Sequence, residues 1–304
     1  MSTKGLYIFF NLVYAKAFTC TLAILLIFVM IACNDNRNQD TVNISLKVMS
    51  YNIRLNTQSD IPSGNGWDDR KHWLAGLIRY HEPAIFGLQE VLLNQLEFIQ
   101  EKFPDYTYSG LGRDDGETGG EFSPVFYNSK MFELLDEGTF WLSETPEIPS
   151  KGWDADINRI VSWVKLKHIS SGKFFFFLNT HFDHIGVEAR KNSARLIIDK
   201  VNEIAADVPF ILTGDFNVPD DSEPYNLLAS AFNDAKVVSQ HGHYGPKGSW
   251  STFSVCGDTK LERRIDFIFV HDDIKVIKHA ILSDSKDGRY PSDHLPVVAE
   301  ITLE

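Results

Sequence analysis

The sequence predicts an α/β fold in which β-sheets are covered by helices. From residue 45 onward, short apolar runs typical of strands alternate with amphipathic segments typical of helices, and no internal repeat occurs. Length alone suggests about two domains. No linker divides the chain, however, so we expect one large domain over residues 45–304.

Strands are predicted where apolar and β-branched residues run between turn residues. These runs are residues 46–51, 84–88, 125–127, 160–168, 174–179, 210–212, 265–270 and 297–303. Helices are predicted where apolar residues recur every three to four positions, at 70–80, 92–103 and 188–205. Residues 111–122, 144–156 and 241–249 form long loops, and such loops are often functional.

The first 33 residues have the composition of a secretory signal peptide. They carry Lys4 and Lys16, no acidic residue, and an apolar run over residues 17–32. This run is short for a helix crossing the ~30 Å bilayer core, which takes about 20 residues. An uncleaved anchor helix is therefore the lesser alternative.

The apolar run ends at Cys33, and residues 34–40 that follow are polar or charged. This pattern resembles a bacterial lipoprotein cleavage site, which implies that Cys33 is lipidated. We therefore expect residues 34–44 to form a polar linker. The protein is expected to be exported and held at a membrane, in the periplasm or at the cell surface, or otherwise to be secreted.

Cysteine content and net charge restrict the possibilities further. Cys256 is the one cysteine left in the predicted domain, so no disulfide forms within it and stability must come from the core. The chain has net charge −12, and because residues 1–33 carry two lysines and no acid, the remainder has −14. Proteins that bind long nucleic acid non-specifically usually carry a basic face. We therefore expect a small or surface-derived ligand.

Polar side chains that can bind metal recur where the predicted strands end. Strand ends are held rigidly by a sheet, so these side chains can converge on one point. Singly, each has an ordinary explanation such as a helix cap or an Asx turn, but together they indicate a site. They are Asn52, Glu90, His181, Asp215, Asn217, Asp266, Asp293 and His294. Hard oxygen ligands with imidazoles, and no thiolate cluster, favour Mg²⁺ or Mn²⁺ over zinc.

The segments around these residues resemble the endonuclease/exonuclease/phosphatase superfamily, which includes deoxyribonuclease I, abasic-site endonucleases, neutral sphingomyelinases and inositol polyphosphate phosphatases. The resemblance rests on residues 51–54, 88–90, 179–184, 214–217, 264–269 and 292–294, which occur in the family's order. It implies a four-layer α/β sandwich, with two mixed β-sheets packed face to face and helices on the outer faces. The site would lie at one edge of this sandwich.

The same resemblance implies roles for the residues that match the motifs. Glu90 corresponds to the principal metal ligand, with Asn52 and Asp293 assisting. Asp215 and Asn217 correspond to the pair that orients the attacking water and the scissile phosphate. A metal ion bound there would neutralise charge on the phosphoryl oxygens during hydrolysis.

Two histidines complete the implied machinery. His294 corresponds to a histidine paired with Asp266, which would fix its tautomer. His181 corresponds to a second phosphate-contacting histidine or a general acid. The general base stays open between His294 and Asp215.

We therefore predict a monomeric phosphoesterase, dependent on Mg²⁺ or Mn²⁺, that hydrolyses a phosphodiester or phosphomonoester outside the cytoplasm. Arg159, Arg190 and Trp250 are candidate substrate contacts. Two alternatives are equally good: Arg190 can lie on a solvated helix face, and Trp250 can pack in the core. A secreted nuclease acting on DNA or RNA is the alternative enzyme. A surface binding protein on a degenerate enzyme fold is the alternative from another class, disfavoured because no motif has lost its ligand.

Overall fold

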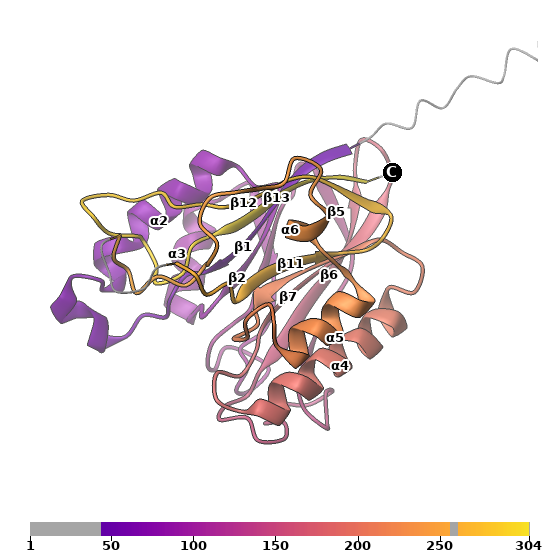
Figure 1. Ribbon diagram of the computed structural model, residues 1–304, viewed down its shortest axis with the longest axis horizontal. Coiled ribbons are helices and arrows are strands. Elements are labelled where there is room, and N and C mark those ends of the chain that lie inside the picture. The colour runs from indigo at the N-terminus through magenta and orange to yellow at the C-terminus, as the bar shows by residue number, and fades with distance from the viewer. Residues whose placement is uncertain (1–43, 256–260, 304) are drawn as a thin grey trace, which may run out of the picture. The chain divides into compact units, whose positions relative to one another are not determined.

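The computed structural model describes residues 44–255 and 261–303. The predicted signal peptide, Cys33, the linker up to residue 43 and Cys256 lie outside these residues, and Ile44 already belongs to the first strand. Two mixed sheets pack face to face between helices, which confirms the predicted four-layer α/β sandwich (Figure 1). In the part of the chain that the structure describes, no helix is both long and apolar enough to cross a bilayer.

The first sheet has seven strands in the order β10-β12-β13-β1-β2-β4-β3. In chain order they are β1 (Ile44–Asn52), β2 (Ile85–Gln89), β3 (Tyr106–Ser109), β4 (Val125–Asn128), β10 (His243–Tyr244), β12 (Ile274–Ile281) and β13 (Val297–Leu303). The short helix η1 (Gln58–Ser63) and helix α2 (Trp67–His81) connect β1 to β2, and helix α3 (Leu93–Lys102) follows β2. Because α2 crosses between them, β1 and β2 run parallel.

The second sheet has six strands in the order β5-β6-β7-β8-β11-β9. They are β5 (Phe132–Trp141), β6 (Ile160–His168), β7 (Phe174–His181), β8 (Phe210–Asp215), β9 (Asn233–Asp234) and β11 (Asp266–Val270). Helix α4 (Val187–Ile204) connects β7 to its parallel neighbour β8, and helices α5 (Glu223–Ala231) and α6 (Ala235–Val238) follow. Each sheet thus contains a parallel pair joined by a helix.

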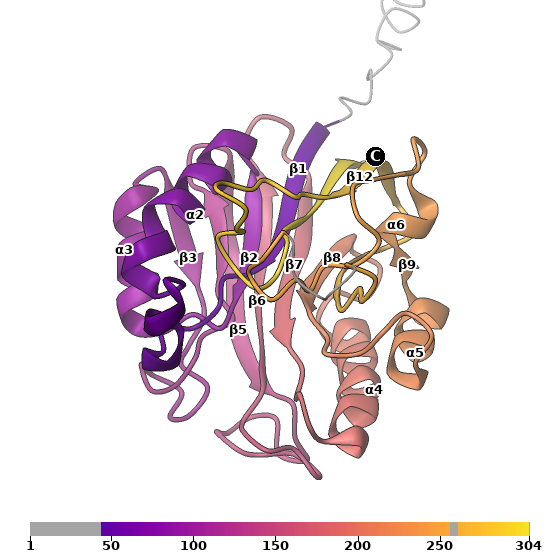
Figure 2. The same ribbon diagram turned by 60° about the vertical axis from the view of Figure 1, so that its left-hand side comes forward.

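Three hydrophobic clusters hold the layers together. One lies between the sheets and includes Val48 and Phe177; a second packs α2 and α3 onto β1, β2 and β4; the third packs α4 and α5 onto β7, β8 and β11. Figure 2 shows α2 and α3 on one side of the sandwich and α4 and α5 on the other. Strands such as β7 are therefore buried on both faces and read as continuous apolar runs.

The alternation of side chains along each strand positions the site. Residues two apart share a face of a strand. Because Val48 and Phe177 face the inter-sheet core, Asn52 and His181, four positions further along the same strands, face the same space. By the same period, β8 places Asp215 between the sheets. Polar residues thus replace the core at one end of the sandwich.

The sequence did not predict the strands β3, β5 and β12, the two-residue strands β9 and β10, or the helices η1, α5 and α6. β3 and β5 are edge strands, and β12 is bordered on one side by the two-residue β10 alone. Exposed charged residues interrupt their apolar pattern, as at Asp136 and Glu137 in β5 and Lys275 in β12. Charge on edge strands prevents unwanted pairing with other chains and also weakens the sequence signal.

Candidate active site

A buried polar layer lies between the hydrophobic core and the site. A Cβ atom at Gly87 would clash with Asn179 and lie 2.6 Å from the Thr213 hydroxyl, so the two sheets approach closely at this glycine. Gln89 Nε2 donates to Asn179 Oδ1 (2.6 Å) and to Ser50 Oγ (3.2 Å), and Thr213 Oγ1 donates to Asn179 Oδ1 (3.0 Å). These contacts between β1, β2, β7 and β8 set the relative position of the sheets beneath the site.

A pocket of about 340 Å³ lies above this layer, with walls from both sheets. Eight of the predicted site residues line it: Glu90, Arg159, His181, Asp215, Asn217, Trp250, Asp293 and His294. Asn52 and Asp266 are almost fully buried behind the wall, hydrogen-bonded to lining residues. Arg190 does not line the pocket, and its guanidinium donates to the Asp183 carbonyl (3.1 Å).

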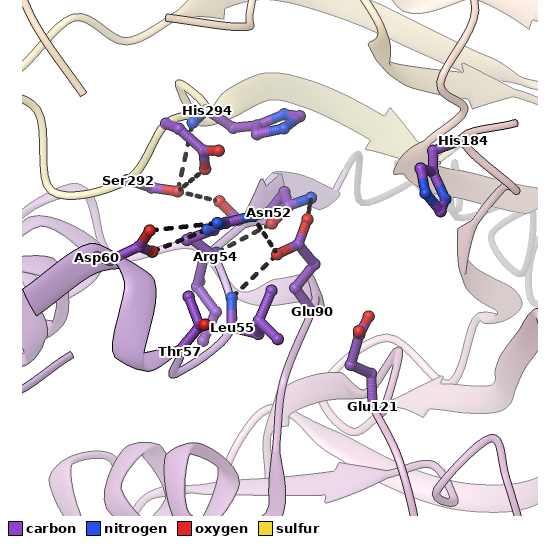
Figure 3. A network of polar contacts seen from close by, with 12 residues as sticks. Asn52, Arg54, Leu55, Thr57, Asp60, Glu90, Glu121, His184, Ser292 and His294 are labelled. Carbon is purple, nitrogen blue, oxygen red and sulfur yellow. Dashed lines mark hydrogen bonds and ion pairs between the residues drawn. The ribbon is translucent and has the colours of Figure 1, made fainter. Parts of the chain in front are cut away.

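Asn52 connects two carboxylates from different sheets. Its Nδ2 donates to Glu90 Oε1 (3.0 Å) and to Asp215 Oδ2 (2.9 Å). Glu90 Oε2 accepts from the Leu55 amide (3.0 Å) and lies 3.8 Å from the Arg54 guanidinium. Figure 3 shows these contacts around Glu90, with His184 and Glu121 across the pocket from Arg54. Both carboxylates are thus held in place by side-chain or backbone donors.

His294 forms a buried chain with Asp266 and Ser249. His294 Nδ1 lies 2.9 Å from Asp266 Oδ2, and this oxygen also accepts a hydrogen bond from Ser249 Oγ (2.6 Å). On the other side of the ring, His294 Nε2 lies 3.6 Å from Asp215 Oδ2. Burial alone would lower the pKa of His294, but the charges of Asp266 and Asp215 raise that pKa well above its usual value. The imidazole is therefore oriented by one carboxylate and faces another.

The pKa values of His181 and Asp215 are both shifted from their usual values: that of His181 is lowered and that of Asp215 is raised. Burial, with the nearby charges of Arg159 and Arg113, lowers the pKa of His181 well below its usual value. Its Nε2 lies 3.0 Å from Asn217 Nδ2. Burial, reinforced by the charge of Asp266, raises the pKa of Asp215 to about 7. His181 is therefore neutral at pH 7, and Asp215 is poised between its two protonation states.

Glu121, which sequence reasoning missed, lines the far wall of the pocket together with the predicted Arg159. Arg113 and Glu121 make a two-pronged ion pair (2.7 and 2.8 Å), and Glu121 Oε2 lies 3.9 Å from His181 Nδ1. The Arg159 guanidinium is 4% exposed and lies 3.6 Å from Asp183. Glu121 lies in the Gly- and Asp-rich loop 111–122. The length of this loop was the one feature of the sequence that indicated a functional role for it.

Three pocket residues have left-handed backbone conformations that are costly for residues with a Cβ. They are Arg54 (φ 59°), Glu90 (φ 59°) and Asn217 (φ 51°). Such strain is of order 1 kcal/mol or more per residue and collects at functional sites, where the surrounding structure enforces it. Each residue directly follows or lies close to a strand end, so the turn aims its side chain back toward the pocket.

The arrangement contains a candidate site for a divalent cation. One ligand atom each from Glu90, Asp215 and His294 lie within 4.8 Å of one another. Asp293 lines the same pocket, and burial together with the charge of Glu90 raises its pKa. Buried carboxylates placed this close repel one another, and a hard cation would relieve that repulsion. The residues therefore fit the predicted metal.

The sandwich and its pocket of carboxylates, amides and paired histidines define a phosphoester hydrolase. Residues 49–294 match the model of the Endonuclease/Exonuclease/phosphatase family, and the chain belongs to this family. The resemblance predicted from the motifs is confirmed.

Solved structures and curated relatives give more detail. An endonuclease/exonuclease/phosphatase family protein from Bacteroides thetaiotaomicron is 40% identical, with a TM-score of 0.83 over 86% of this chain and 99% of that one. A mannosyl-6-phosphatase from the same organism is 41% identical, with a TM-score of 0.81 over 84% of this chain and 99% of that one. A probable RNA exonuclease from Saccharomyces cerevisiae is 29% identical over 62% of this chain and 40% of its own length.

Proposed function

We propose that this protein is a divalent-metal-dependent phosphatase that hydrolyses a small phosphomonoester. The observation that carries the proposal is the convergence of Glu90, Asp215 and His294 within 4.8 Å, in a pocket that Arg54, Arg159 and Arg263 also line. Carboxylates suit a hard cation, and arginines beside them suit the oxygens of a phosphoryl group.

Glu90 and Asp293 would hold Mg²⁺ or Mn²⁺. The bound ion supplies charge neutralisation at the phosphoryl oxygens. Asn52 keeps Glu90 and Asp215 in position through its two amide hydrogen bonds. Asn217 Nδ2 donates a hydrogen bond to the Phe182 carbonyl (3.0 Å) and lies 3.0 Å from His181 Nε2. Asn217 would thus hold the ring of His181 toward the phosphate.

Asp215 and His294 have different roles in the proposed reaction: His294 stabilises charge and Asp215 accepts a proton. With Nδ1 against Asp266, His294 presents only Nε2 to the pocket, and its raised pKa keeps it cationic, so it stabilises charge on the phosphoryl oxygens. Asp215, with a pKa of about 7, accepts the proton of the attacking water. The lowered pKa of His181 supports a phosphate-contacting role rather than a general acid.

A small phosphomonoester is favoured over a polymer for two reasons. The mature chain would carry net charge −14, which repels polyanions. The mannosyl-6-phosphatase is 41% identical across 84% of this chain, a closer likeness than the 29% of the probable RNA exonuclease.

The test is a screen of nucleotides, sugar phosphates, phospholipid head groups, DNA and RNA, with EDTA, Mg²⁺ or Mn²⁺. We expect metal-stimulated release of inorganic phosphate from a small monoester. We also expect Mg²⁺ to raise the thermal unfolding midpoint of the EDTA-treated protein, because a ligand that binds only the folded state stabilises it. Equal turnover in EDTA would contradict the metal assignment.

A secreted nuclease is the second candidate, supported by the name of the yeast relative. It requires binding to polynucleotides that weakens steeply with salt, because bound phosphates release counterions. Affinity for single-stranded DNA or RNA that does not change between low and high salt would remove this candidate.

We further propose that the chain is exported and tethered to a membrane through a lipid on Cys33. β1 begins at Ile44 and ends at Asn52 in the site, so the nine-residue strand separates the entry of the chain from the pocket by ~26 Å. A tether at that end would leave the pocket open to solvent. Fractionation of cells expressing the full chain should recover it with membranes, and Cys33→Ser should release it.

A further inference from the structure

Trp250 and Arg263 lie side by side at the edge of the pocket, next to His294. The Arg263 guanidinium lies 5.3 Å from the centre of the Trp250 ring, a cation–π contact, and both side chains line the pocket. Trp250 forms a β-bridge with His294. We call this pair the rim platform.

The backbone ties the rim platform to the catalytic histidine. The amides of Ser249 and Trp250 donate to the Arg263 carbonyl (2.9 and 3.3 Å), and the Leu295 amide donates to the Ser249 carbonyl (2.6 Å). Ser249 Oγ also donates to Asp266, the partner of His294. The platform therefore has a set position relative to the atoms that would surround the phosphate.

Arg263 differs from the other arginines that line the pocket. Arg54 is paired with Asp60 (2.9 and 3.2 Å), and Arg159 lies beside Asp183 (3.6 Å). Arg263 is exposed and has no hydrogen-bond or ion-pair partner for its guanidinium within residues 44–255 and 261–303. In an acidic chain, its five donors are thus available to a ligand.

Trp250 is the one Phe, Tyr or Trp among the described residues that line the pocket. One aromatic face beside a forked donor suits a pyranose, whose C–H face packs on the ring and whose adjacent hydroxyls accept from the guanidinium. A nucleobase would be held by stacking together with hydrogen bonds to its edge. The Arg263 guanidinium beside Trp250 offers donors only, whereas the edge of a nucleobase presents fixed donors as well as acceptors.

We propose that the rim platform is the binding site for the alcohol part of the substrate and that it selects a hexose ring. This inference rests on the proposed phosphatase function. The phosphate would lie between Asp215 and His294, and the sugar would extend past His294 onto Trp250 and Arg263.

The experiment compares kcat/KM for a hexose 6-phosphate with that for glycerol 3-phosphate, which has hydroxyls but no ring. Trp250→Ala and Arg263→Gln should each lower the ratio of the two values by about tenfold or more, because a site built for ring hydroxyls loses its discrimination. Trp250→Phe, which keeps an aromatic face, should retain most of the ratio. Trp73→Phe and Arg195→Gln, both away from the pocket, are the matched controls.

Other outcomes have distinct meanings. An unchanged ratio in Trp250→Ala and Arg263→Gln, with thermal midpoints like that of the wild type, would overturn the rim platform alone. So would a dependence on Trp250 seen with nucleoside monophosphates and not with hexose phosphates. Absence of metal-stimulated turnover of every monoester would instead overturn the phosphatase function, and with it this inference.

Discussion

Arg70 in helix α2 donates a hydrogen bond to the Pro291 carbonyl (3.3 Å), 221 positions further along the chain. The same guanidinium also donates to the carbonyls of Ile53, Arg54 and Asn65. It lies between the rings of Trp67 and Phe253, at 5.1 and 5.6 Å from their centres. One buried cation thus joins the turn after β1 to the turn that carries Asp293 and His294.

Arg70→Met should therefore destabilise the fold and disturb the site. Several buried carbonyls would lose their donor, so we expect the free energy of unfolding to fall by about 3 kcal/mol. Urea unfolding measures this change. Arg79→Met, an exposed arginine on the same helix, is the control, and its effect should stay within about 0.5 kcal/mol. Equal effects of the two substitutions would show that Arg70 does not join the turns.

Glu90→Ala and His294→Ala should each abolish turnover while leaving the fold intact. Glu90 is half-buried at the pocket surface, so its removal leaves no cavity in the core. We expect kcat to fall by about 10³-fold or more and the Mg²⁺-induced rise in thermal midpoint to disappear in Glu90→Ala. Glu97→Gln, on the exposed side of α3, is the control. Most activity remaining in a metal-free preparation of Glu90→Ala would refute the metal assignment.

Asp266→Asn tests the orientation of His294. The amide keeps the size of the carboxylate but can donate to Nδ1, which would favour the opposite tautomer and remove the charge that raises the pKa of His294. We expect kcat to fall by about 10²–10⁴-fold, with a much smaller change in KM. Steady-state kinetics with one phosphomonoester measures both. A change confined to KM would assign Asp266 to substrate binding.

His279 predicts an acid-sensitive fold away from the site. Burial, with the positive charges of His243, Arg264 and Lys236, lowers the pKa of His279 to about 3, and its Nδ1 lies 2.9 Å from His243 Nδ1. The folded state therefore prefers neutral His279, and the unfolded state takes up the proton first. The stabilisation is complete above the ordinary pKa of 6.5 and is lost as the pH falls from there toward about 3.

At pH 4.5 this effect should cost the wild type about 2–3 kcal/mol relative to pH 7. His279→Leu removes the titrating group, so its loss over the same interval should be smaller by that amount. His241→Leu, at an exposed position nearby, is the control. Urea unfolding at both pH values measures the difference, and an identical pH dependence in His279→Leu would exclude His279 as the cause.

The sequence by itself determined the fold class, the two-sided burial of the central strands and most of the residues of the candidate site. A strand has a period of two, so the apolar pattern of β1, β7 and β8 indicates which polar residues share the face of the core. Asn52, His181 and Asp215 follow from that period, and the motifs around them carry the family resemblance.

The tertiary structure alone decided which loop residues join the site. Arg113 and Glu121 belong to a glycine-rich loop without periodicity, and Trp250 is brought to the pocket by its bridge to His294. The physical reason is the distance along the chain over which each interaction acts. The residue pattern of a strand reflects the burial of that strand, which is local. Ion pairs and ring contacts between loops depend instead on how the two sheets and their connections pack in space.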